Sequence, residues 1–241
     1  MFWCESPRDV VEVTGSDAAS YLQSQVSNDL RALVVGESVW AFLLQPTGKI
    51  DVLVRVWRRD DETFVLDTDA GFGEVLVARL NRFKIRVQVD IEPVDWRCIS
   101  IRGGGIDGLV AWGVGADLLG PDVEPPANVN EGDLGDLLAA RIEACWPAMG
   151  AEVVPGESIP AETGITAAAV SFTKGCYPGQ ELVERMDSRD ASAPRLLQVV
   201  DVPAGTQVGD PLVRDGVVIG TVTSVAGTRA IAAVKRSALL V

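Results

Sequence analysis

The stretch KGCYPGQE, residues 174–181, gathers more chemically useful side chains than any other part of the chain. Cys176 stands two residues after Lys174, and GQELVERM (179–186) follows it as good helical sequence. A lysine and a helix N-terminus both favour an anion, so together they would lower the pKa of the Cys176 thiol. From the residues alone, a reactive thiolate and a small packing residue are equally good interpretations of Cys176.

The neighbouring residues are open to two interpretations as well. Gly175 would let the backbone turn tightly between the lysine and the cysteine. Pro178 suits the first turn of a helix, where its missing N–H costs nothing. Gln180 and Glu181 could be ordinary first-turn residues, with Arg185 as an ion-pair partner of Glu181 one helical turn later.

The composition removes several classes of site. The 241 residues contain no histidine, which excludes Ser-His-Asp and Cys-His catalysis and any imidazole-ligated metal. The four cysteines are far apart in the sequence, so a protein-made metal site is not expected. They are expected to be reduced thiols.

The net charge of −13 argues against nucleic acid as a partner, because an acidic chain repels the phosphate backbone. No apolar run reaches the roughly 20 residues needed to cross a membrane. The N-terminal residues lack the basic-then-apolar order of a signal peptide. We therefore expect a cytoplasmic protein with an acid-rich surface.

The hydrophobic pattern predicts a mixed α+β body followed by a β-rich tail. Expected strands are 10–14, 63–68, 84–91 and 96–101, and 38–45 with 50–57 reads as a hairpin around the turn PTGK. Expected helices are 17–26 with Ser16 as its cap, 71–83 and 134–146. From about residue 195, short β runs separated by Gly, Asp and Pro predict a small barrel or sandwich-like unit.

KGCYPGQE followed by Arg185 resembles the signature of the YgfZ-type folate-binding proteins, which are related to the glycine-cleavage T protein, an aminomethyltransferase. Other blocks resemble the same family. They are GSDAASYLQSQVSNDL (15–30), LLQPTGKI (43–50), RIEACWPAMGAEV (141–153), IPAETG (159–164) and GVVIGTVTS (216–224). The resemblance covers nearly the whole chain.

The resemblance implies an aminomethyltransferase-like folate-binding body over residues 1–190 and a short β-barrel-like domain over 191–241. It also implies tetrahydrofolate, or a one-carbon derivative of it, as the ligand. The implied function is support of 4Fe–4S cluster assembly or repair, with iron–sulfur client proteins or the assembly machinery as partners. No permanently bound metal is implied.

The resemblance carries over only where residues match. It marks Cys176 and Lys174 as the reactive pair, and Tyr177, Gln180, Glu181 and Arg185 as further site residues. Glu143 matches a carboxylate that faces the pterin in the T-protein family, where it can accept from adjacent N–H donors; a surface glutamate is the alternative. Asn28 and Asp29 could line the same cavity.

Two positions depart from the family pattern. Leu53 stands where the T protein has an aspartate that helps to handle the one-carbon unit, although Asp51 lies on the same strand face. Cys145 stands where relatives commonly have glycine. A folate-dependent one-carbon transferase is therefore the alternative function, and a thiol redox module is a third hypothesis that lacks an evident second cysteine.

Overall fold

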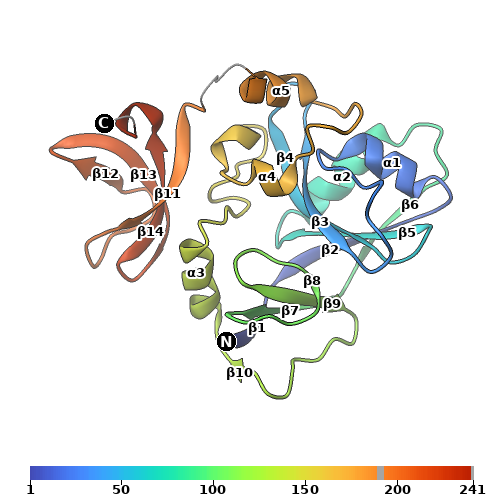
Figure 1. Cartoon of the computed structure of the whole chain (residues 1–241), viewed down its shortest axis with the longest axis horizontal. Helices are drawn as coiled ribbons and strands as arrows, with labels where there is room; N and C mark the ends of the chain where they lie inside the picture. The colour runs from blue at the N-terminus through green and yellow to red at the C-terminus, as the bar shows by residue number, and fades with distance from the viewer. Residues whose placement is uncertain (189–192, 240–241) are drawn as a thin grey trace.

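The computed structural model describes residues 1–188 and 193–239 and has a mixed α+β fold built on three sheets. Two five-stranded sheets form the body, and a four-stranded antiparallel sheet follows near the C-terminus (Figure 1). The α+β class predicted from the hydrophobic pattern is confirmed.

The first sheet has the strand order β3-β4-β5-β2-β6. Its strands are β2 (Arg8–Thr14), β3 (Ser38–Leu44), β4 (Ile50–Arg58), β5 (Thr63–Asp69) and β6 (Asp90–Val94). Helices α1 (Ala18–Gln25) and α2 (Gly73–Phe83) pack against it. The expected hairpin is β3–β4, whose almost entirely buried strands build the main hydrophobic core.

The second sheet has the order β10-β1-β7-β9-β8. Its strands are β1 (Phe2–Glu5), β7 (Arg97–Arg102), β8 (Leu109–Val110), β9 (Gly115–Gly120) and β10 (Asn130–Glu131). Arg55 of β4 joins the two sheets, because its guanidinium pairs with Asp67 of β5 at 2.9 Å and with Asp117 of β9 at 2.5 Å. All three side chains are buried, so this ion network lies in the interior.

The chain then forms α3 (Leu134–Glu143), the short 3-10 helix η1 (Pro160–Glu162), α4 (Thr166–Ala169) and α5 (Gln180–Ser188). The C-terminal sheet, in the order β11-β14-β13-β12, contains β11 (Arg195–Asp201), β12 (Pro211–Arg214), β13 (Val217–Ala226) and β14 (Arg229–Lys235), and η2 (Arg236–Ala238) follows. Helix α3 packs on β13 and β14 and connects this sheet to the body (Figure 1). The expected domain boundary, between residues 190 and 191, lies outside the described residues.

Two local expectations are wrong. The strand expected over 84–91 begins only at Asp90, where pairing with Thr14 starts, because Arg86 has a left-handed φ of 57° that is incompatible with a strand. Ser16 does not cap α1, since the N-cap position is Asp17, whose carboxylate accepts from the Gln88 backbone N–H. Over the described ranges, no helix has both the length and the apolar character to span a membrane.

Candidate functional site

The loop that carries Cys176 is anchored by Lys174. The ammonium Nζ donates to the carbonyl oxygens of Gln23 at 2.7 Å, Val26 at 2.5 Å and Asn28 at 2.8 Å. These carbonyls lie at and just beyond the C-terminal end of α1, where backbone acceptors lack helical partners and a cation is favourable. Burial lowers the pKa of Lys174 to about 8.

Tyr177 and Gln180 hold the other end of the loop. Tyr177 is buried, and its ring centroid lies 5.2 Å from the Lys174 ammonium. Its backbone N–H donates to Oε1 of Gln180 at 3.0 Å, so Gln180, the first residue of α5, reaches back to the residues before the helix. Burial also raises the pKa of Tyr177 to about 12, which keeps its phenol protonated at neutral pH.

Two glycines dock the loop on the β3–β4 turn. Gly179 has a φ of +84°, and a Cβ there would lie 2.4 Å from the Gln45 carbonyl oxygen. Gly48, in the turn itself, faces Leu182 of α5, and a Cβ added at Gly48 would lie 2.4 Å from the Leu182 Cβ. The LLQPTGKI and KGCYPGQE blocks therefore form one packed unit, which explains why both need glycine at these positions.

Cys176 is exposed, whereas Cys4 and Cys98 are buried and Cys145 is half-buried. The ammonium of Lys174 donates to three backbone carbonyls, so the structure gives this lysine an anchoring role rather than the role of direct thiolate partner that the spacing predicts. Gly175 has neither a left-handed φ nor a heavy atom within 4 Å of an added Cβ, so the structure shows no local requirement for glycine at this position.

Asn28 and Asp29 lie beside the Lys174 anchor. The Asn28 amide nitrogen donates to the Trp40 carbonyl at 2.8 Å and to the Ala168 carbonyl at 2.9 Å. The Asp29 carboxylate accepts from Arg31, which holds the pKa of that carboxyl well below its usual range. Both side chains therefore stabilise the chain segment after α1, to which Lys174 of the motif is hydrogen-bonded.

Glu181 and Arg185 are exposed on α5. Within the described ranges, no ion pair joins their side chains, although they are spaced one helical turn apart. The structure leaves both charges facing solvent beside the loop that carries Cys176.

Glu143 lies in a different place from the motif. It is the last residue of α3, which is well separated from α5 (Figure 1). Its carboxylate accepts from Arg229 of β14 at 2.7 and 3.0 Å, and this contact lowers the pKa of Glu143. Arg229 also pairs with Asp201 at 2.9 Å. The structure therefore does not bring Glu143 together with Asn28, Asp29 and Lys174.

A pocket of about 320 Å³ lies beside Glu143. Its other walls include Arg102, Trp112, Ala140 and Ala144. The Arg102 guanidinium lies 3.9 Å from the Trp112 ring centroid and donates to Asp117 at 2.8 Å. Within the described residues, the Nε of Arg102 has no hydrogen-bond partner, but it is buried and is not open to the pocket.

Arg102 and Trp112 were not identified from the sequence. Arg102 directly follows the strand predicted over 96–101, and Trp112 stands in a stretch without a motif, so neither position carries a signal of its own. Only the pairing of β7 with β9 brings the arginine to Asp117, and thereby to this pocket.

Leu53, and Asp51 on the same strand, are both engaged in contacts within the structure. Leu53 is buried in β4. One Asp51 oxygen accepts from Gln45 at 2.8 Å, and the other pairs with Arg79 of α2 at 3.2 Å. Asp51 therefore forms part of the ion pairing between β4 and α2.

The chain is similar to several known proteins. No protein-family model matches the chain. An uncharacterised protein of Haemophilus influenzae is 30% identical over an alignment that covers 76% of this chain and 67% of that protein. A mouse protein named iron–sulfur cluster assembly factor IBA57, mitochondrial, is 28% identical, with 92% of this chain and 70% of that protein covered.

A Yersinia pestis relative, named tRNA-modifying protein YgfZ, is 27% identical, and the alignment covers 91% of this chain and 79% of that protein. The chain belongs to the YgfZ family. Among solved structures, the aminomethyltransferase T of the Bartonella henselae glycine cleavage system matches with a TM-score of 0.69, covering 98% of this chain and 78% of its own. At 17% identity this match shows that this chain has the aminomethyltransferase fold.

Proposed function

We propose that the protein binds tetrahydrofolate and supports the assembly or repair of iron–sulfur clusters through the thiol of Cys176. The observation that carries this proposal is that Cys176 is exposed on a loop whose neighbours are firmly anchored. The mouse relative is named as an iron–sulfur cluster assembly factor, which supports the same role in this chain.

The construction of the loop argues that the exposure of Cys176 is functional. Cysteine is among the residue types most often buried, and Cys4 and Cys98 of this chain follow that rule. The motif loop instead half-buries Lys174, whose ammonium donates to three carbonyls there, and leaves the cysteine exposed. A thiolate is a ligand for iron and an acceptor of sulfur, so an accessible thiol on a rigid support suits a transient contact with a client or assembly partner.

The pocket beside Glu143 has groups that fit a pterin. A pterin ring presents adjacent N–H donors, and the pocket offers the Glu143 carboxylate as their acceptor. Trp112 adds an aromatic wall. Tetrahydrofolate would supply one-carbon carrier chemistry, while these residues of the chain bind and orient the ring.

The transferase alternative has less support. Handling a one-carbon unit calls for a carboxylate near the reactive folate nitrogens, and Asp51, which could replace the acid missing at Leu53, is paired with Arg79 and Gln45. The accessory role is therefore the proposal that we favour. The mouse relative is named for iron–sulfur cluster assembly and the Yersinia relative for tRNA modification. A client enzyme that modifies tRNA and contains an iron–sulfur cluster would account for both names. This acidic chain would then not need to contact RNA itself.

The test of the thiol is complementation of a strain that lacks its own YgfZ-family gene, read as the activity of a 4Fe–4S enzyme. Cys176→Ala is expected to fold normally and to leave that activity at the level of the deletion. The matched control, Cys145→Ala, removes a half-buried thiol and is expected to complement fully. Full complementation by Cys176→Ala would rule out the mechanism through this cysteine.

The test of the ligand is a calorimetric titration with tetrahydrofolate. Glu143→Gln is expected to weaken binding at least tenfold, because the amide presents a donor where the pterin needs an acceptor. Asp201→Asn also alters the surroundings of Arg229 but leaves the Glu143 carboxylate in place, so its affinity is expected to match the wild type. If the wild type, Glu143→Gln and Asp201→Asn bound tetrahydrofolate with equal affinity, Glu143 would not be part of the folate site.

A further inference from the structure

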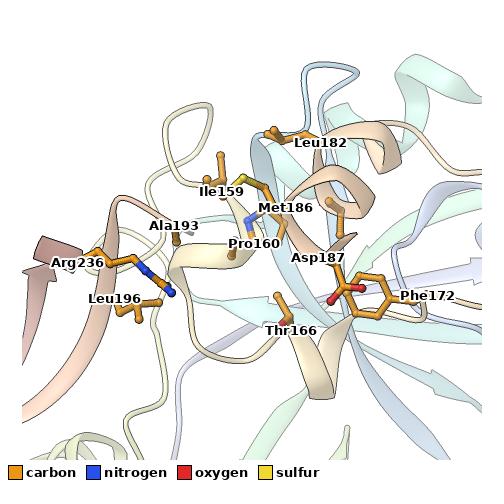
Figure 2. A pocket seen from close by; sticks show the side chains of 12 residues that line it. Ile159, Pro160, Thr166, Phe172, Leu182, Met186, Asp187, Ala193, Leu196 and Arg236 are labelled. Atoms are coloured by element: carbon orange, nitrogen blue, oxygen red, sulfur yellow. The ribbon is translucent and has the colours of Figure 1, made fainter. Parts of the chain in front are cut away.

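A second cleft lies beside α5, away from the pocket at Glu143. Its volume is about 220 Å³, and its walls come from η1, α4, α5 and the start of the C-terminal sheet. Figure 2 shows the side chains that line it. We call it the α5 cleft, and it shares no residue with the Glu143 pocket.

Most of the side chains that line the α5 cleft are apolar, although its exposed surface also includes polar atoms. Leu182 and Met186 of α5 form one wall, and Leu196 of β11 and Ile159 also line the cleft (Figure 2). Phe172 remains 44% exposed beside it. An apolar cavity of about 150 Å³ is large enough to hold benzene, so this cleft has room for one ring-sized apolar group and a short polar extension.

Two charged side chains of opposite sign, Arg236 and Asp187, lie at opposite ends of the α5 cleft. Arg236 of η2 is half-buried and extends its guanidinium into the cleft, while Asp187 stands near Phe172 on the far side (Figure 2). Within residues 1–188 and 193–239, no carboxylate pairs with Arg236, whereas nearby Arg195 pairs with Glu162. A half-buried guanidinium favours a carboxylate partner, which it can meet with two parallel hydrogen bonds.

We propose that the α5 cleft binds a small monocarboxylate that carries one ring-sized apolar group. The carboxylate contacts Arg236, and the apolar group lies between Met186 and Leu196. Asp187 repels a second negative charge at the far end, which selects against dicarboxylates. This site is additional to the proposed folate pocket and does not depend on it.

The test is a titration of the full chain with 3-phenylpropionate, followed by NMR of the methionine methyl groups. The expected dissociation constant is on the order of 1 mM, as for other ligands of this size. The neutral amide, 3-phenylpropionamide, is expected to bind at least tenfold more weakly. Equal affinity for acid and amide, or no saturable binding of the acid, would overturn the proposal.

Two variants locate the binding. Arg236→Gln keeps most of the packing and is expected to weaken 3-phenylpropionate binding at least tenfold, with an unchanged unfolding midpoint. Arg214→Gln removes an arginine of β12 that lies outside the α5 cleft, and the affinity of this variant is expected to stay at the wild-type value. Unaltered binding by Arg236→Gln would overturn the site.

A competition experiment separates this site from the folate proposal. Saturating tetrahydrofolate is expected to leave the affinity for 3-phenylpropionate unchanged, because the two pockets share no residue. Glu143→Gln is likewise expected to bind 3-phenylpropionate with wild-type affinity, even if it no longer binds tetrahydrofolate. Competition between the two ligands would overturn the assignment to a separate cleft.

Discussion

Gly179 lies against Gly48, so that a Cβ at Gly179 would be 3.0 Å from the Gly48 Cα and 2.4 Å from the Gln45 carbonyl oxygen. The contact joins the loop that carries Cys176 to the turn of the β3–β4 hairpin. Because the β3–β4 strands are almost entirely buried, the hairpin gives the motif loop a rigid support.

Gly179→Ala is expected to destabilise the protein by about 2 kcal/mol or more, since it combines a left-handed φ with a backbone clash. Denaturant unfolding measures the loss. The control is Gly175→Ala in the same motif, where an added Cβ meets nothing within 4 Å, and a change of no more than about 0.5 kcal/mol is expected. An equal loss of unfolding free energy in the two variants would contradict the close packing of Gly179 against the β3–β4 turn.

Replacing Arg55 by methionine is expected to cost about 3 kcal/mol, because it removes the cation that the buried Asp67 and Asp117 carboxylates share and leaves them with Arg8 and Arg102 alone. The measurement is the free energy of unfolding in urea. Arg31→Gln removes an exposed arginine that is paired only with Asp29, so little change in stability is expected there. A small effect at Arg55 would mean that this network does not hold the two sheets together.

Cys145→Gly is expected to stabilise the protein by about 0.5–1 kcal/mol. Cys145 follows α3 with a left-handed φ of 49°, in a turn where its N–H bonds to the Ile142 carbonyl and the Trp146 N–H bonds to the Arg141 carbonyl. Glycine is the usual residue at this position of such a turn. The neighbouring Ala144→Gly, at an ordinary helical φ of −76°, should instead destabilise, and thermal unfolding distinguishes the two.

The stability contribution of Lys174 is expected to change with pH. The pKa of this lysine is about 8 in the folded chain and 10.5 in its ordinary state, so between these values the unfolded chain binds the proton that the folded chain has released. Stability relative to Lys174→Met should therefore rise as the pH increases from about 8 to 10.5. Unfolding of both proteins at pH 7.5 and pH 10 tests this, and a constant difference would contradict the lowered pKa.

Much of the fold follows from local patterns. The alternating and buried runs of β2, β3, β4 and β5, and the amphipathic spacing of α2, are properties of short segments that the structure reproduces. The two-residue strands β8 and β10 are different, because only their pairing with β9 and β1 makes them strands. Residues 84–89 alternate like a strand, but the left-handed turn at Arg86 breaks the pattern.

The sequence by itself determined the identity of the motif, its helix and the likeness to the YgfZ family, because these depend on residue types at fixed spacing. Only the tertiary structure decided where the charges lie. In the folded chain, Lys174 donates to carbonyls at the end of α1, and Cys176 is exposed to solvent. Glu143 pairs with Arg229, and Asp51 pairs with Arg79. A side chain's partners depend on segments far away in the sequence, and burial makes an unpaired charge too costly to leave alone.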